Sequence, residues 1–337
     1  MSRGARRRQR QQPRSLQVFL IIFLVLLTVC VLVKAFFLKA PEQKAAELPA
    51  KPASSDTDSQ QSPEEQAAQE ALRSHLERKG GFYTILLSGL DDDNGGSDTN
   101  ILVAVDTVNG YVYGVSIPRD SKAIIGGKAH KINYAYNKGG TELLADTVSE
   151  QLGIPVDYTV SVNLKGFTAL VDAIGGVDFD VPINMDYDDP IQNLSIHFKK
   201  GVQHLSGADA LRVVRFRHNN DGSGYGSEDL GRMATQQKFL KAVAKKMLSA
   251  GNILTKIDDY AKIFNQYVDT NLTVGNLAWL GTEVLKMGVD KIDFSTLPNA
   301  WKYPYIYLDP TETLTLVNTY LNPYVEDRTA DDLNIPG

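Results

Sequence analysis

A small set of charged side chains in this sequence has the chemistry to bind phosphate and a divalent cation. Asp91 and Asp98 flank a glycine-rich acidic loop, and Arg119 follows the next two apolar runs. Farther along, Arg215 and Arg217 alternate around a phenylalanine, so both guanidinium groups point the same way if the chain is extended. Guanidinium groups bind phosphate bidentately, and Mg²⁺ is typically held by one or two carboxylates together with substrate phosphates. The residues therefore indicate a phosphate site with Mg²⁺ on Asp91 and Asp98.

A later segment adds further groups to this set. Asp229, Arg232 and Gln236 are spaced i, i+3 and i+7, so they share one face of a helix that Ser227 is expected to cap. The alternative explanation for all these charges is an internal network of Asp and Arg ion pairs without any ligand. The sequence leaves both explanations open. It offers no obvious general base, since metal binding would compromise Asp98 in that role.

A predicted β-hairpin brings Asp98 and Arg119 to one place. Two apolar runs, 101–105 and 111–117, are joined by Asn109-Gly110, a pair that tolerates positive φ in a type I′ turn. A two-residue turn would pair Val108 with Tyr111 and place Asn100 opposite Arg119. Asp98 then enters the hairpin and Arg119 leaves it at the same open end. Both runs are apolar on both faces, so we expect them in the middle of a sheet that is covered on each side.

The rest of the pattern alternates strands with helices. This order favours an α/β fold with a mixed β-sheet covered by helices on both faces. The elements predicted outside the hairpin are a strand over 83–88, a helix over 141–152, a strand over 158–162, a helix over 164–174, a strand over 177–181, a helix over 208–214, a helix from 228 to 247, helices over 256–267 and 273–287, a strand over 291–296 and a last helix over 310–320.

The amino-terminal region predicts a single transmembrane helix. Residues 1–16 form a basic tail without acidic residues, and residues 17–38 give an apolar run of about 20 residues, enough to cross a bilayer. The excess of arginine before the span places the tail in the cytoplasm and the rest of the chain outside. A cleaved signal peptide and a lipoprotein signal are the alternatives. No small-x-small site follows the apolar core, however, and Val29 before Cys30 is not small.

After the span, the composition predicts a spacer over 39–79, one globular domain over 80–325 and a C-terminal tail over 326–337. The first 39 residues hold eight of the 35 basic residues and none of the 40 acidic ones, so the remainder carries a formal charge of −13. This acidity argues against a nucleic-acid partner, and any anion site must come from local clustering of arginines. Cys30 is the only cysteine and lies in the predicted span, so no disulfide or thiol nucleophile is available outside.

Several short motifs contain these residues, namely Gly89-Leu90-Asp91, Ser97-Asp98-Thr99, Ser116-Ile117-Pro118-Arg119-Asp120, Lys131-Ile132-Asn133, Ile174-Gly175-Gly176-Val177, Arg215-Phe216-Arg217, and Asp229-Leu230-Gly231-Arg232 with Gln236-Gln237. From about residue 82 to 250, the sequence resembles the LytR-CpsA-Psr (LCP) family of bacterial cell-wall enzymes. Two features depart from the family pattern. Thr235 stands where the family often has another arginine, which predicts a weaker hold on phosphate, and the loop from Asp91 to Asp98 is shorter than in several members.

The resemblance implies a phosphotransferase that moves a glycopolymer from a polyprenyl-(pyro)phosphate carrier to peptidoglycan, at the outer face of the cell membrane. It makes 80–325 the catalytic domain, with Mg²⁺ on Asp91 and Asp98. The resemblance implies that the catalytic residues are Arg119, Arg215, Arg217 and Asp98. The same three arginines, together with Arg232 and Gln236, are implied to bind the substrate phosphates.

The family also implies a hydrophobic groove for the lipid tail. The candidates for its wall, with ordinary core packing as the alternative, are Val160, Val162, Phe167, Leu170 and Val171. Two other functions fit the same residues: a polyprenyl-phosphate or glycan-binding protein without turnover, and a lipid pyrophosphatase that uses water as the acceptor. The sequence does not say whether the polymer is teichoic acid, capsule or another glycan.

Overall fold

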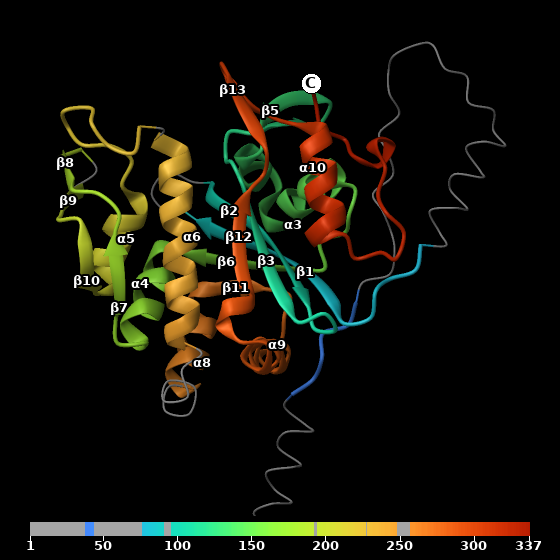
Figure 1. The fold of residues 1–337 in the computed structure, drawn as a ribbon, viewed down its shortest axis with the longest axis horizontal. Helices are drawn as coiled ribbons and strands as arrows, with labels where there is room; N and C mark the ends of the chain where they lie inside the picture. Colours follow the sequence, from blue (N-terminus) through green and yellow to red (C-terminus); the bar gives the residue numbers. More distant parts are fainter. Residues whose placement is uncertain (1–37, 44–75, 91–95, 192–193, 227, 248–256) are drawn as a thin grey trace, which may run out of the picture.

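The centre of the fold is a six-stranded mixed sheet with the strand order β11-β6-β1-β2-β3-β12 (Figure 1). The computed structural model describes residues 38–43, 76–90, 96–191, 194–226, 228–247 and 257–337. Strands β1, β2 and β3 pair antiparallel, whereas β6 runs parallel to β1 and β12 runs parallel to β3. The six strands are β1 (Phe82–Leu90), β2 (Ser97–Asp106), β3 (Tyr111–Ile117), β6 (Tyr158–Asn163), β11 (Val268–Thr270) and β12 (Ile292–Thr296).

The predicted hairpin is present as β2 and β3, but the predicted register is wrong by two residues. Asp106, not Val108, pairs with Tyr111, so the loop has four residues instead of two. Asn100 consequently lies opposite Ile117 and not opposite Arg119. When the observed register is continued beyond the paired residues, the position opposite Arg119 is that of Asp98.

The side chain of Asp106 explains the longer loop. Its Oδ1 accepts hydrogen bonds from the backbone N–H groups of Val108 at 3.0 Å and Asn109 at 2.8 Å. An aspartate that bonds to the backbone two residues ahead stabilises a turn of its own and competes with further strand pairing. Gly110 supplies the residue with positive φ, at 73°, as the sequence predicts.

Helices cover both faces of the sheet, as predicted. On one face, α3 (Asn133–Leu152) contributes Leu144 and Val148 to a core that includes Leu86 of β1 and Leu102 of β2. On the other face, α9 (Val274–Met287) contributes Leu280 to a second core. The burial pattern of β2 and β3 follows from this arrangement, because a strand between two layers needs apolar side chains on both faces.

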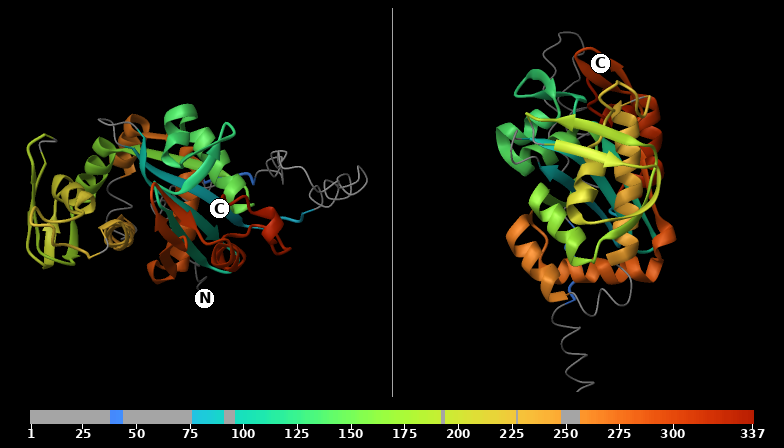
Figure 2. Two further views of the ribbon diagram at one scale, coloured as in Figure 1. Left: turned by 90° about the horizontal axis from the view of Figure 1, so that it is seen from above. Right: turned by 90° about the vertical axis from the view of Figure 1, so that its left-hand side faces the viewer.

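A smaller lobe lies beside the sheet and has a hydrophobic core of its own (Figures 1 and 2). Phe179, Phe216 and Phe239 are fully or almost fully buried in it. The strand predicted over 177–181 exists, but it pairs with β10 and does not join the central sheet. The lobe consists of α4 (Leu164–Ala173), α5 (Gly207–Arg215), α6 (Glu228–Met247), the pair β7 (Val177–Val181) and β10 (Gly201–Leu205), and the pair β8 (Met185–Asp189) and β9 (Leu194–Phe198).

The other predicted helices and strands are present with shifted ends. α3 begins at Asn133 instead of 141 and is kinked at Gly139 and Gly140, which have non-helical backbone angles. The predicted last helix is α10 (Pro310–Leu316) continued by a wider π-type turn, Val317–Leu321. The remaining elements are α8 (Ile257–Tyr267) and two hairpins that the sequence analysis did not predict, β4 (Lys122–Ile125) with β5 (Lys128–Lys131) and β13 (Asn299–Lys302) with β14 (Tyr305–Leu308).

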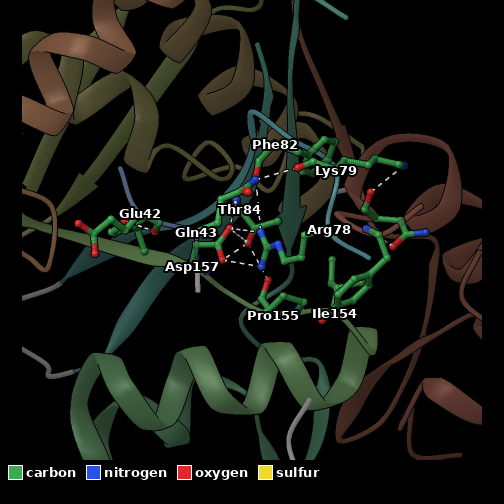
Figure 3. Close-up of polar contacts among 12 residues, drawn as sticks. Glu42, Gln43, Arg78, Lys79, Phe82, Thr84, Ile154, Pro155 and Asp157 are labelled. Carbon is green, nitrogen blue, oxygen red and sulfur yellow. Dashed lines mark hydrogen bonds and ion pairs between the residues drawn. The ribbon is translucent and has the colours of Figure 1, made fainter. Parts of the chain in front are cut away.

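Residues 38–43, which we call the strap, lie against the domain beside the first residue of β1 (Figure 3). Gln43 Nε2 donates to the carbonyl oxygens of Lys79 and Phe82, each at 2.8 Å. Asn276 Nδ2 on α9 donates to the carbonyl oxygen of Lys39 at 2.9 Å, and Pro41 is buried. The strap is the beginning of the predicted spacer, and it is bound to the folded domain at two separate elements.

A buried ion pair stands next to the strap. The guanidinium of Arg78 donates to both carboxylate oxygens of Asp157, at 2.9 and 2.7 Å, and Asp157 is fully buried (Figure 3). Thr84 N also donates to this carboxylate, at 3.0 Å. Removing one partner of a buried ion pair is strongly destabilising, because the other charge is left buried without a counter-charge. The Arg78–Asp157 pair therefore fixes the edge of the sheet at which the strap lies.

The segment after residue 325, predicted as a tail, packs on the domain as well. Arg328 is buried and pairs with Asp332. Asn334 Nδ2 donates to a carboxylate oxygen of Glu150 on α3, at 2.8 Å. Among the described residues, no helix is long and apolar enough to cross a membrane. The predicted span, except for Leu38, lies outside the described residues.

Candidate functional site

A large cavity opens between the central sheet and the smaller lobe. Its volume is about 700 Å³, and it is lined from β1, β2, β6, α4, α5 and α6. Its apolar wall, as we call the hydrophobic part of the lining, consists of Leu87, Leu90, Ile101, Val160, Val162, Leu164, Phe167, Leu170, Leu194, Leu211, Val214, Phe216, Phe239 and Leu240. Four of the five residues proposed for a lipid groove are thus in the wall. The fifth, Val171, does not line the cavity, because it is fully buried in the core of the smaller lobe.

The predicted phosphate-binding residues all line this same cavity. They come from three separate segments: Asp98 and Arg119 from the hairpin, Arg215 and Arg217 from the end of α5, and Arg232 and Gln236 from α6. We call Arg119, Arg215, Arg217 and Arg232 the arginine cluster. Asp91, the other proposed metal ligand, lies outside the described residues, so its role stays a prediction.

The hairpin holds Asp98 and Arg119 in contact. The two side chains form an ion pair, and Arg119 Nε also lies 3.5 Å from an oxygen of Asp120. Lys131 pairs with the other oxygen of Asp120 at 3.1 Å. These four charged side chains therefore form an internal ion-pair network, which is the explanation that the sequence left open as the alternative to a ligand site. The side chains of Arg119 and Asp98 are 31% and 38% exposed, so the pair is partly screened by water and weak enough to rearrange around an anion.

The end of α5 positions the next two arginines. Ser206 caps the amino end of the helix by accepting from the backbone N of Asp209, and the helix ends at Arg215. Phe216 then adopts an extended conformation (φ −61°, ψ 134°) and is only 1% exposed. Because the phenyl ring anchors the chain in the lobe, Arg215 and Arg217 flank it and both face the cavity. Arg215 still belongs to the helix and Phe216 lines the cavity as well, so the strand-like alternation assumed for this segment is wrong, although both arginines do reach the cavity.

α6 brings Arg232 and Gln236 to the cavity on one helix face, as their spacing predicts. Gln236 Nε2 donates to the carbonyl oxygen of Val214 at 3.1 Å, which ties α6 to the end of α5 just before Arg215. The side chain of Asp229, predicted on the same face, lies outside the described part of the chain. Gln236 therefore holds the backbone just before Arg215, and its expected role in orienting an arginine or a phosphate stays a prediction.

Thr235, which stands where the family often has an arginine, faces away from the cavity. It is 2% exposed, and its hydroxyl lies 2.9 Å from the Tyr225 hydroxyl and 3.0 Å from the Gly231 carbonyl oxygen. Burial raises the pKa of the Tyr225 phenol above its ordinary value, so the ring stays neutral against Phe216. This contact joins the glycine-rich loop 219–226 to α6.

A second, much smaller cavity lies beside the first and shares Asp98, Arg119, Arg232 and Gln236 with it. Asn100 lines this small cavity and is 1% exposed, yet within the described chain neither its Oδ1 nor its Nδ2 has a hydrogen-bond partner. Buried amides are normally paired, so an amide of this kind marks a place for a ligand or water. Asp98, Thr99 and Asn100 line this cavity in succession, at the point where the pairing of β2 with β1 is irregular: Gly89 lies opposite Thr99 and Leu90 opposite Ser97.

Comparison with known proteins identifies the family of the chain. The model of the LytR_cpsA_psr family matches residues 48–321. The chain belongs to this family.

Named family members show the same likeness. The polyisoprenyl-teichoic acid–peptidoglycan teichoic acid transferase TagV of Bacillus subtilis is 37% identical over 202 residues, which are 57% of this chain and 50% of the relative. The corresponding TagU enzyme of Bacillus cereus is 37% identical over 195 residues, 56% of this chain and 60% of the relative. The matches thus span between half and three fifths of these relatives. The crystal structure of B. subtilis TagV superposes with a TM-score of 0.61 at 31% identity, covering 72% of this chain and 96% of that one.

Within this family fold, sequence reasoning missed two polar residues of the cavities, Asn100 and His218. Asn100 lies two residues after Asp98, and this closeness in sequence to a predicted site residue was the available signal. His218 follows directly after Arg217 and lines the large cavity. Its Nδ1 lies 2.9 Å from the carbonyl oxygen of Asn219, so Nδ1 carries the proton in the neutral ring and Nε2 is the basic nitrogen.

Proposed function

We propose that this LCP protein is a phosphotransferase that moves a glycopolymer from a polyprenyl-(pyro)phosphate carrier to peptidoglycan. One observation supports this most: a single cavity joins four arginines to an extended apolar wall. A ligand that fits both parts needs an anionic head and a long apolar tail, which describes a polyprenyl phosphate. The names of the TagV and TagU relatives, polyisoprenyl-teichoic acid–peptidoglycan teichoic acid transferases, point to the same substrate class.

In this reaction an acceptor hydroxyl attacks the phosphorus that bears the polymer. A new O–P bond forms to the acceptor, and the bond from that phosphorus to the bridging oxygen breaks, which releases the polyprenyl phosphate. Negative charge grows on the bridging oxygen as it leaves. The arginine cluster binds the phosphates through charge-assisted hydrogen bonds and stabilises this developing charge, since its donors are already held in place by the hairpin, Phe216 and α6.

The acceptor hydroxyl must lose a proton, and His218 is suited to receive it. Among the described residues that line the large cavity, Asp98 is the only carboxylate and is engaged by Arg119, whereas Nε2 of His218 is the basic nitrogen of a ring oriented by its bond to the Asn219 carbonyl. A histidine held in one tautomer by a carbonyl acceptor is a suitable general base near neutral pH.

The residues present fit a magnesium ion. The carboxylate of Asp98 and the unpaired amide oxygen of Asn100 face one small cavity, and both are oxygen ligands of the kind that hard cations prefer. Asp98 would hold the ion, with Asn100 beside it and Asp91 as the further ligand expected from the sequence. A bound Mg²⁺ supplies positive charge that neutralises the phosphate oxygens.

The proposal places the protein in the cell membrane as a single-pass protein, with the amino terminus in the cytoplasm and the domain outside. The basic tail and the apolar run 17–38 support this topology. The names of the TagV and TagU relatives support glycopolymer and peptidoglycan as partners, and the acidic outer part argues against nucleic acid. Protease added to intact cells should degrade residues 80–325, and protection of this region would contradict the topology.

The decisive experiment incubates the full chain, in detergent micelles with Mg²⁺, with a lipid-linked teichoic-acid precursor and purified peptidoglycan. Covalent polymer on the peptidoglycan, together with released polyprenyl phosphate, is the expected result. Release of polymer phosphate into water at the same rate without peptidoglycan would identify a pyrophosphatase. Lipid binding without any release would identify a binding protein.

A further inference from the structure

Two aromatic side chains stand out from the surface at the β13–β14 hairpin. Trp301 is 70% exposed and Tyr303 is 81% exposed, and their ring centroids are 6.4 Å apart. Lys302 lies between them in the chain and is exposed as well. Exposed aromatic side chains that lie together in this way usually mark a contact surface for a partner. We call Trp301, Lys302 and Tyr303 the aromatic tip.

The hairpin that bears the aromatic tip is bonded to the loop that holds Arg119. The backbone N of Ile306, on β14, donates to the carbonyl oxygen of Asp120 at 2.9 Å, and Ile306 forms an isolated parallel bridge with Ser121. Ile306 also lines the small cavity together with Asp98 and Arg119. The aromatic tip is therefore an outward extension of the same structure that positions the phosphate-binding residues.

Two lysines lie at the Tyr307 ring next to the aromatic tip, and one of them, Lys122, also donates to the carbonyl oxygen of Gly337. Nζ of Lys302 lies 5.8 Å from the centroid of the Tyr307 ring, and Nζ of Lys122 lies 5.0 Å from it. β4, which contains Lys122, contacts β14. Figure 1 shows the two hairpins to which these strands belong close together, at the labels β5 and β13. The exposed Lys302 between the two aromatic side chains favours a partner with carboxylate groups, although the outer part of the chain is acidic as a whole.

The position of the strap argues against the membrane as the partner. The strap bonds to Phe82, the first residue of β1, whereas Leu90, the last residue of β1, lines the large cavity with Arg119. The strap continues directly from the predicted membrane span, so the bilayer lies at the amino end of β1. The aromatic tip is bonded to the opposite end, where the reaction would take place.

We propose that the aromatic tip binds the glycan strand of the acceptor peptidoglycan; this inference rests on the proposed function. The C–H faces of sugar rings stack on the π faces of Trp301 and Tyr303, while the indole N–H and phenol O–H offer hydrogen bonds to ring substituents. Lys302 pairs with the carboxylates of the peptides attached to the strand. The aromatic tip thereby holds an acceptor hydroxyl near the arginine cluster.

The test measures sedimentation of the full chain, in detergent micelles, with purified peptidoglycan sacculi freed of attached polymers and without any lipid donor. We expect W301A/Y303A to bind about thirtyfold more weakly, since two stacking contacts of about 1 kcal/mol each are lost. W301F/Y303F keeps the π faces and should bind nearly as the wild type does. V202A, which truncates another highly exposed side chain on β10, should change nothing. Binding of a lipid phosphate should stay the same in all variants.

Three outcomes would overturn the inference. The first is unchanged sedimentation of W301A/Y303A with sacculi. The second is full binding by W301L/Y303L, because apolar area without a π face would then suffice. The third is a W301A/Y303A variant that no longer binds phosphatidylglycerol vesicles but still binds sacculi as the wild type does, which would show that the aromatic tip contacts a membrane. Because no donor is present, these results do not depend on turnover: a wild type that binds sacculi through the aromatic tip but transfers no polymer would refute the proposed function alone.

Discussion

The arginine cluster and the apolar wall belong to one cavity but are built in different ways. The arginine cluster comes from three segments far apart in sequence, each fixed by its own hydrogen bonds: the β2–β3 hairpin, the end of α5 and one face of α6. The wall comes from side chains that simply continue the cores of the sheet and the smaller lobe. The cluster therefore depends on geometry and the wall on size and polarity, and substitutions should separate the two.

The largest effect is expected from removing two members of the arginine cluster. R215A/R217A should weaken binding of a short-chain polyprenyl phosphate by at least about a hundredfold, because hydrogen bonds to charged groups contribute roughly 1.5–3 kcal/mol each. Isothermal titration with the full chain measures the loss. Circular dichroism should show an unchanged fold, and a loss confined to long-chain lipids would contradict the separation between cluster and wall.

Geometry within the cluster can be tested with charge held constant. R217K should lower turnover about ten- to hundredfold, because a lysine ammonium cannot form the two parallel hydrogen bonds of a guanidinium group. R212K is the matched control, since Arg212 is exposed near the end of α5 and pairs with Asp209 outside the cavity lining. If R217K and R212K both turn over at the wild-type rate, Arg217 does not bind phosphate bidentately.

Asp98 should separate binding from turnover. D98A should remain folded, since its carboxylate is part of a half-exposed pair, and it should lose metal-stimulated turnover by roughly tenfold, the effect of one charge-assisted contact. Lipid-phosphate affinity should stay equal or rise, because a negative charge beside Arg119 is gone, whereas R119A should lose affinity.

The control for D98A is D293A, which removes an exposed carboxylate that pairs with Lys241 outside the cavity lining. Turnover with and without Mg²⁺, together with thermal unfolding, distinguishes the outcomes. An unfolded D98A protein would show that Asp98 serves as a structural ion-pair partner. Normal turnover that Mg²⁺ still stimulates would place the metal elsewhere.

The smallest effect is expected from the apolar wall. V160F fills part of the cavity, so it should reduce affinity for a long-chain polyprenyl phosphate about three- to tenfold, equivalent to losing roughly one methylene or two of buried tail. A short-chain analogue should bind as before. V202F, on the exposed face of β10, is the control. Equal losses for both chain lengths would mean that the wall does not contact the tail.

The sequence predicted those parts of the site that depend on local periodicity. Arg232 and Gln236 lie one helical turn apart, so their common direction follows from backbone geometry alone. The sheet and its helical layers also followed from apolar patterns and glycine signals. The family resemblance supplied the substrate class, which no pattern in the chain encodes.

The parts that could not be predicted depend on competition between local and distant contacts. The register of the hairpin depends on Asp106, whose side chain accepts hydrogen bonds from the loop backbone. These bonds stabilise a four-residue loop in place of the two-residue turn that Asn109-Gly110 predicts. Val171 has the same character as the residues of the apolar wall, and only the packing of α4 decides that it faces the core. The β13–β14 hairpin was missed because its strands are short, four residues each, and three of the four residues of β13 are exposed.

The strap has a mechanical consequence. β1 has nine residues, and at about 3.3 Å per residue it separates the strap from the cavity end by roughly 30 Å. With the predicted span in the bilayer, β1 acts as a spacer of fixed length. On the proposed function, a carrier lipid must then be pulled well out of the membrane before its phosphate reaches Arg119, and the apolar wall replaces the hydrocarbon that the extracted isoprenoid units leave behind. Extraction from one apolar medium into another costs little, so the proposed function requires no release of the membrane-bound donor to water at the height of the cell wall.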